Sequence, residues 1–238
     1  MTKPNFASIN ILLDGSGSMA SLVSDTIGGV NQFLTDQQAV PGEAMVSLCI
    51  FNTKPEIVHD CVPLASVPLL DNKTYRASGG TALLDAVGLS IDNLGKKLAD
   101  MKEEDRPSKI LFLIITDGEE NSSSIPSDEF VRIQEDVKRK TASGKGHYGV
   151  GTLKLKYTLD RIKEMIEHQK SKYNWEFVFM GANIDAFGAG ASLGVAKSST
   201  LQYDATSDGT KRLYATASAA TTRFRDGSGG GGFFGNNP

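Results

Sequence analysis

Short apolar runs alternate with segments of helix-spaced apolar residues along almost the whole chain. Residues 8–13 form a strand-like run that ends in a turn-rich loop, and residues 22–38 then carry apolar residues at the spacing of one helix face. Residues 109–115 are almost continuously apolar, which is typical of a strand that is covered on both faces. The pattern predicts strands that alternate with helices.

The remaining segments continue this alternation. Residues 45–51 and 56–62 are apolar runs joined by a turn signal at residues 52–55, which predicts a hairpin and one antiparallel edge strand. We expect further strands at residues 175–180 and 200–203, and further helices at residues 81–94, 130–140, 159–172, 184–193 and 210–225. The whole predicts an α/β fold with a doubly wound, mostly parallel, Rossmann-like sheet, one antiparallel edge strand and helices on both faces.

The chain is expected to form one domain followed by a tail. Its 238 residues suffice for one sizeable core, and we assign residues 1–225 to this domain. Residues 226–238 are mostly glycine and predict a flexible tail. Phe233 and Phe234 are expected to be exposed on this tail, either as a docking peptide or without a function.

Composition and charge exclude several functional classes. Hydrophobic residues make up 39% and charged residues 22% of the chain, which is typical of a soluble globular domain. The formal net charge is -3 and there is no long basic run, so we do not expect nucleic acid as a partner. We expect no signal peptide, no membrane segment, a cytoplasmic location, and reduced thiols at Cys49 and Cys61.

Three polar loops fall at the carboxyl ends of the predicted parallel strands, where such sheets bind ligands. The loop after the first strand carries Asp14, Ser16 and Ser18, the loop before the central helix carries Thr81, and the loop after the central strand carries Asp117. All five side chains are hard oxygen donors. Mg²⁺ takes about six oxygen ligands and commonly keeps several waters, so this set predicts a magnesium site, and Mn²⁺ or Ca²⁺ also suits it.

Three segments carry a resemblance to a known family: Asp14-Gly15-Ser16-Gly17-Ser18, Gly79-Gly80-Thr81 and Thr116-Asp117-Gly118. Together they resemble the metal-ion-dependent adhesion site of von Willebrand factor A domains, in order and in context, with no motif position missing. The resemblance covers about residues 7–225, and residues 25–34 and 118–123 are similar to small stand-alone bacterial and phage members. Relative to those members, we expect an insertion at about residues 127–157.

The resemblance implies a ligand set and a kind of partner. It implies Asp14, Ser16 and Ser18 as the first ligand group, Thr81 as the hydroxyl of the second loop and Asp117 as the carboxylate of the third. A partner protein would then complete the coordination of the metal with an aspartate or a glutamate. The alternative is that Ser16 and Ser18 cap a helix while Asp117 belongs to an ordinary turn.

Other polar residues near these loops have two interpretations each. Asp85 is expected either to interact favourably with the dipole at the N-terminus of its helix or to accept a hydrogen bond from a metal-bound water. Glu119 and Glu120 are expected at the exposed rim. The three histidines have no spacing that indicates a shared metal, and we expect them to be structural or exposed: His59, His147 and His168.

The leading functional hypothesis is a non-enzymatic, divalent-cation-dependent protein–protein interaction module. The alternative is a structural or accessory subunit of a larger assembly, joined through the insertion or the tail. A magnesium-dependent phosphoryl-transfer enzyme is least favoured, because Ser16 stands where haloacid dehalogenase-like phosphatases have a second aspartate as general acid. The sequence leaves open the partner, the process and the oligomeric state.

Overall fold

The computed structural model describes residues 2–127, 131, 155–230 and 232–235. Six strands form one sheet: β1 (Lys3–Asp14), β2 (Glu43–Phe51), β3 (Pro55–Pro63), β4 (Pro107–Thr116), β5 (Glu176–Gly181) and β6 (Thr200–Gln202). The described α-helices are α1 (Val23–Gln38), α2 (Leu83–Asp100), α4 (Leu159–Tyr173), α5 (Ala186–Ser192) and α6 (Ser207–Asp226). Short 3-10 helices are η1 (Gly17–Leu22), η2 (Leu64–Ser66), η3 (Glu103–Asp105) and η4 (Lys197–Ser199).

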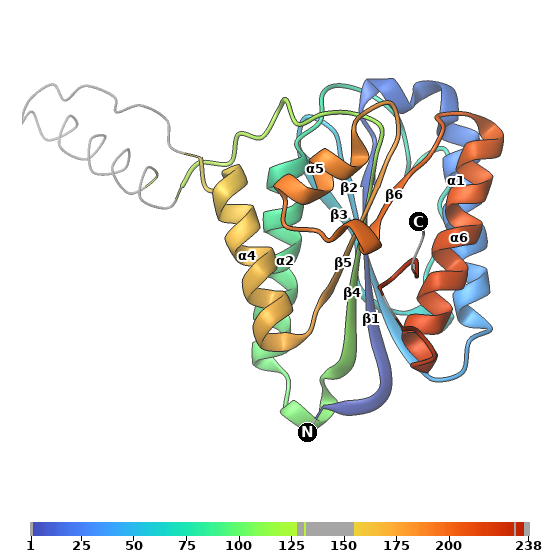
Figure 1. Ribbon diagram of the computed structural model, residues 1–238, viewed down its shortest axis with the longest axis vertical. Coiled ribbons are helices and arrows are strands. Elements are labelled where there is room, and N and C mark those ends of the chain that lie inside the picture. The colour runs from blue at the N-terminus through green and yellow to red at the C-terminus, as the bar shows by residue number, and fades with distance from the viewer. Residues whose placement is uncertain (1, 128–130, 132–154, 231, 236–238) are drawn as a thin grey trace, which may run out of the picture.

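The strand order is β3-β2-β1-β4-β5-β6, and every neighbouring pair is parallel except β2 and β3. Helices α1 and α6 cover one face of the sheet, and α2, α4 and α5 cover the other (Figure 1). The predicted doubly wound α/β fold with one antiparallel edge strand is therefore confirmed. The expected helix at residues 130–140 and most of the expected insertion at 127–157 lie outside the described residues.

The two faces of the sheet carry separate apolar cores because successive side chains of a strand point to opposite faces. In β1, Ile11 packs with the core under α1 and α6, whereas Leu12 packs with the core under α2, α4 and α5. In β4, Leu113 and Ile114 divide in the same way. Burial on both faces explains why the β4 sequence shows no polar alternation.

Helix caps and a glycine at a helix contact help to position the helices on these cores. The side chains of Thr158 and Thr206 cap α4 and α6, and each accepts a hydrogen bond from a backbone N–H three residues later. Helices α1 and α6 approach closely because Gly29 has no side chain, and a Cβ at this position would overlap the Tyr214 ring.

None of the helices in the described part of the chain is both long and apolar enough to cross a membrane.

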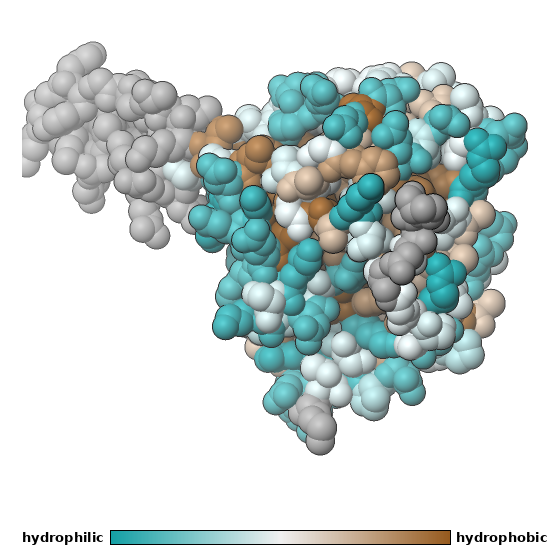
Figure 2. Space-filling model, in the orientation of Figure 1, coloured by the Kyte–Doolittle hydropathy of each residue, from teal (hydrophilic) through white to brown (hydrophobic). Residues whose placement is uncertain are grey.

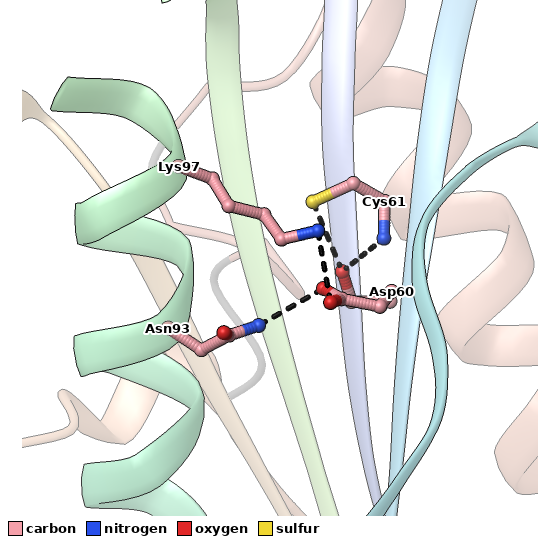
Figure 3. A network of polar contacts seen from close by, with 5 residues as sticks. Asp60, Cys61, Asn93 and Lys97 are labelled. Atoms are coloured by element: carbon pink, nitrogen blue, oxygen red, sulfur yellow. Dashed lines mark hydrogen bonds and ion pairs between the residues drawn. The ribbon is translucent and has the colours of Figure 1, made fainter. Parts of the chain in front are cut away.

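The edge strand β3 is tied to α2 by a small polar network (Figure 3). The Lys97 ammonium lies 2.8 Å from the Asp60 carboxylate, which also accepts a hydrogen bond of 2.9 Å from Asn93. The next residue, Cys61, has a left-handed backbone (φ 55°), and its N–H donates to the Ser47 hydroxyl at 3.0 Å. Both cysteines of the chain are free thiols. This irregular edge, with its charged side chains, is a poor template for adding another strand.

The tail differs from the sequence-based expectation. Gly227 caps the end of α6 with a positive φ of 82° that turns the chain back, and Phe233 is then only 8% exposed. Its ring lies 6.2 Å from the Phe224 ring, and the N–H of Phe234 donates to the Ser198 carbonyl at 3.0 Å. The expectation that both aromatic side chains are exposed is wrong for Phe233, because the glycines let it fold onto the apolar core beside α6. The division of the chain at residues 225/226 stays a prediction.

We predict that Phe233→Ala lowers the free energy of unfolding by about 3 kcal/mol, because a buried phenyl ring is lost and a cavity remains. The half-buried neighbour provides the control, since Phe234→Ala should cost clearly less. Urea unfolding followed by far-ultraviolet circular dichroism measures both values. Equal stability of the wild type and the Phe233→Ala variant would show that the tail does not pack on the core in solution.

Candidate metal centre

Asp14 ends β1, and Thr116 ends the neighbouring parallel strand β4, so both residues lie at the same edge of the sheet. The Asp14 side chain is fully buried. One of its oxygens, Oδ1, accepts a hydrogen bond of 2.7 Å from the N–H of Ser16, and Oδ2 accepts one of 2.5 Å from the Thr116 hydroxyl. The carboxylate is therefore held in one orientation at the carboxyl end of the central strands.

The first loop meets the third loop through its two serines. The hydroxyls of Ser16 and Ser18 lie 3.0 Å apart, and Ser18 donates a hydrogen bond of 2.5 Å to Oδ1 of Asp117. Ser16 and Asp117 are almost fully buried, whereas Ser18 is exposed. The cluster is thus open to solvent on the side of Ser18.

Thr81 reaches the same cluster from the second loop. A Cβ placed on Gly118 would lie 3.1 Å from the Thr81 hydroxyl, 3.7 Å from the Ser18 hydroxyl and 3.9 Å from Oδ2 of Asp14. Side chains from the first and second loops therefore surround the space beside Gly118 of the third loop. The structure brings together all five residues that the sequence singled out, and their role as metal ligands stays a prediction.

The electrostatics of the cluster favour a cation. Burial raises the pKa of the Asp14 carboxyl above its ordinary value, and the nearby Asp117 carboxylate raises it further. Burial also raises the pKa of Asp117. Among the residues that the structure describes, no lysine or arginine forms an ion pair with either aspartate. Two buried carboxylates and three hydroxyls are a donor set that fits a hard divalent cation.

No second cluster competes for this role in the described ranges, where no group of three or more His, Cys, Asp or Glu side chains could hold a metal. His59 lies with Nε2 3.1 Å from the Pro68 carbonyl, and His168 packs edge-on against Tyr173. His59 is thus buried in a structural contact, and His168 is exposed. His147 lies outside the described residues.

One supporting residue is not recognisable from sequence spacing. The hydroxyl of Tyr75 donates a hydrogen bond of 2.6 Å to the backbone carbonyl of Asp14, which lies 61 positions earlier in the chain. Tyr75 is fully buried, and burial raises the pKa of its hydroxyl, so it remains a neutral donor. It fixes the backbone at the point where β1 turns into the first loop.

The third loop folds over the beginning of α2 and holds Thr81 in place. Oδ1 of Asn121 accepts a hydrogen bond of 2.8 Å from the N–H of Thr81, and the N–H of Asn121 donates to the Thr81 carbonyl at 3.0 Å. Glu120 accepts a hydrogen bond of 2.8 Å from the N–H of Leu84. Glu119 is exposed as expected, whereas Glu120 is only partly exposed, because its carboxylate accepts the hydrogen bond from a free amide of the helix end.

Asp85 lies in the first turn of α2, which fits the expected interaction with the helix N-terminal dipole, and it also contacts the third loop. It is almost fully buried, and its Oδ2 accepts hydrogen bonds from the N–H groups of Ser124 at 2.6 Å and Ile125 at 3.0 Å. Burial raises the pKa of this carboxyl. Asp85 therefore anchors the far end of the third loop to α2. This contact cannot be predicted from the sequence, because it depends on the conformation of the loop.

Comparisons with known proteins give a likeness in structure only. Neither a scan against protein-family models nor a search of curated proteins gives a match. Among solved structures, the chain is similar to the PilB minor pilin from Streptococcus sanguinis, with a TM-score of 0.60 and 11% identity over 92% of this chain and 61% of the pilin chain.

Two further solved structures are similar to the chain. A von Willebrand factor type A protein from Catenulispora acidiphila has a TM-score of 0.50 and 13% identity over 92% of this chain and 43% of that one. Proximal thread matrix protein 1 from the mussel byssus, with a zinc-occupied MIDAS motif, has a TM-score of 0.53 and 11% identity over 91% and 46%. The chain spans less than two thirds of each of these proteins, and at such identities the likeness establishes the fold alone.

The raised pKa of Asp14 predicts a pH-dependent effect of Asp14→Asn in the absence of divalent cations. Ionising this carboxyl costs stability in the folded state, and the cost appears as the pH rises above 3.8, its ordinary value. The asparagine variant should therefore be more stable than the wild type at pH 7, and the difference should shrink at pH 4. Urea unfolding in chelator at both pH values measures this. A variant less stable than the wild type at pH 7 would contradict the electrostatic argument.

Proposed function

We propose that this chain, which has a von Willebrand factor A-like fold, is a non-enzymatic, divalent-cation-dependent protein–protein interaction module. In this proposal, one Mg²⁺ ion is held by Asp14, Ser16, Ser18, Thr81 and Asp117, and an aspartate or glutamate of a partner protein completes its coordination. The observation that carries the proposal is the convergence of these five oxygen-bearing side chains from three loops.

The chemistry of the donor set supports an open metal position. Two carboxylates neutralise a divalent cation without giving the site excess negative charge, and the hydroxyls are neutral donors, so the ion stays electrophilic toward a further carboxylate at an open coordination position. The exposed Ser18 marks the side from which a partner can approach. Mn²⁺ and Ca²⁺ accept the same ligands. The mussel protein of similar fold has zinc in its MIDAS motif, which supports a divalent ion at the corresponding place.

The surroundings of Asp14 argue against a catalytic role. A nucleophilic carboxylate must reach its substrate, but both oxygens of Asp14 accept hydrogen bonds and the side chain is fully buried. Ser16, two residues later, cannot act as a general acid in the way that a carboxyl does. These surroundings support a binding function over an enzymatic one.

A second candidate function is that of a structural or accessory subunit in a larger assembly. The likeness to a minor pilin over 92% of this chain favours it, although that likeness concerns the fold. Both candidates involve a protein surface, and they differ in whether the metal is required for assembly. A cytoplasmic location also stays a prediction.

Metal binding should appear as a gain in folding stability. If the five side chains hold Mg²⁺, the free energy of unfolding should rise by about 2.7 kcal/mol at a Mg²⁺ concentration one hundred times the dissociation constant. Asp14→Ala should abolish this gain. Asp105→Ala is the matched control, because η3 leads into the opposite end of β4 and this variant should respond like the wild type. Urea unfolding with MgCl₂ and with chelator tests the prediction, and equal stability in both would contradict it.

Partner binding should require the same site. The immobilised chain is mixed with host lysate in the presence of Mg²⁺, in chelator, and as the Asp14→Ala and Asp105→Ala variants. We expect a partner that is retained by the wild type and by Asp105→Ala but lost in chelator and with Asp14→Ala, and whose capture fails when one acidic residue of the partner is replaced. A partner retained under all four conditions would favour the assembly function instead.

A further inference from the structure

An apolar groove lies directly beside the candidate metal centre. Its volume is about 430 Å³, within the range of roughly 300–1,000 Å³ that is common for ligand sites. The groove lies between the beginning of α2, the third loop, the beginning of α4, and α5. Hydrophobic surface gathers where α4 and α5 come together (Figure 2). Its large apolar lining residues are Leu83, Leu84, Leu159, Phe179, Ile184 and Leu193.

Two contacts make the groove continuous with the candidate metal centre. Gly118 lines the groove, and a Cβ on the same residue would lie 3.1 Å from the Thr81 hydroxyl. Leu83 and Leu84 line the groove two and three residues after Thr81, at the first turn of α2. A polypeptide that brings one side chain to the metal position can therefore place a neighbouring side chain in the groove.

The walls and the rim of the groove differ in character, and this difference indicates what it can accept. Leu159 is 43% exposed although it is a large apolar side chain. At the rim, Glu119 and Asp185 are exposed carboxylates, and Glu120 is partly buried. An acidic side chain is repelled by this rim, whereas an apolar side chain gains by covering Leu159.

We propose that this groove determines which partner segments bind. It receives a leucine, isoleucine, methionine or phenylalanine side chain from the same polypeptide segment that provides the metal-binding carboxylate. This inference rests on the proposed function. The metal selects a carboxylate without regard to its surroundings, and the groove selects the acidic residues that have an apolar neighbour. The acidic rim adds a penalty for segments with a second carboxylate at the groove position.

A displayed peptide library tests the proposal directly. The peptides have one fixed central aspartate and random residues at the four positions on either side, and they are selected on the immobilised full chain in Mg²⁺. We expect apolar residues to be enriched about tenfold at one flanking position, because burying one such side chain is worth at least this factor in affinity. Acidic residues should be depleted at that position.

Three variants separate the groove from the metal. Leu159→Gln makes one wall polar at an exposed position, so the fold should be unaffected, and its Mg²⁺-dependent stabilisation should equal that of the wild type. This variant should capture the library in Mg²⁺ without the apolar preference. Leu69→Gln, at a 53% exposed leucine outside the groove lining, is the matched control and should keep the preference. Asp14→Ala should lose all Mg²⁺-dependent capture.

The possible failures are distinguishable. Mg²⁺-dependent capture without an apolar preference, or with a preference that Leu159→Gln keeps, overturns the groove assignment and leaves the proposed function intact. Absence of Mg²⁺-dependent capture overturns the proposed function and this inference with it. Light scattering measures the oligomeric state of the wild type and of Leu159→Gln. A wild-type dimer that this substitution dissociates would show that the groove binds a second copy of the chain, and it would overturn the proposal.

Discussion

The buried Asp14 carboxylate is the interaction on which the loops at the carboxyl edge of the sheet depend. It sits at the end of a central strand, its two oxygens bond to the first loop and to Thr116, and the nearby Asp117 makes its ionisation less favourable. The parallel pairing of β1 and β4 fixes this proximity, because it places the ends of both strands at the same edge. A sheet of this kind concentrates negative charge where a cation can relieve it.

The loops around this charge are held by hydrogen bonds from residues outside the set of five oxygen donors. Tyr75 fixes the carbonyl of Asp14, Asn121 bonds to both backbone groups of Thr81, and Glu120 and Asp85 hold the third loop against the beginning of α2. Such supports fix the orientation of possible ligands before any ion arrives, which lowers the entropic cost of binding. All four side chains form these hydrogen bonds with backbone groups and not with the five oxygen donors themselves.

The sequence predicts the fold and the five clustered residues for the same reason. A strand that is buried on both faces must be apolar throughout, so β4 and the position of Asp117 after it are visible in the sequence. The supporting hydrogen bonds cannot be predicted from the sequence, because Tyr75 lies 61 positions from its acceptor and the contact of Glu120 depends on the conformation of a loop. The packing of the tail cannot be predicted in this way, because a glycine-rich segment has no hydrophobic pattern of its own and the burial of Phe233 depends on the core that it contacts.

The metal and the groove would divide the work of recognition between two physical effects. A divalent ion offers strong attraction to any carboxylate, and therefore little selectivity among the many acidic residues on protein surfaces. An apolar groove is weak alone but discriminates by shape and by the exclusion of charge. The structural relatives share the sheet at 11–13% identity, which shows how little of the sequence the sheet requires. Most residues that line the groove come from helices and loops, where this chain is free to differ, so in this proposal its choice of partner would be encoded there.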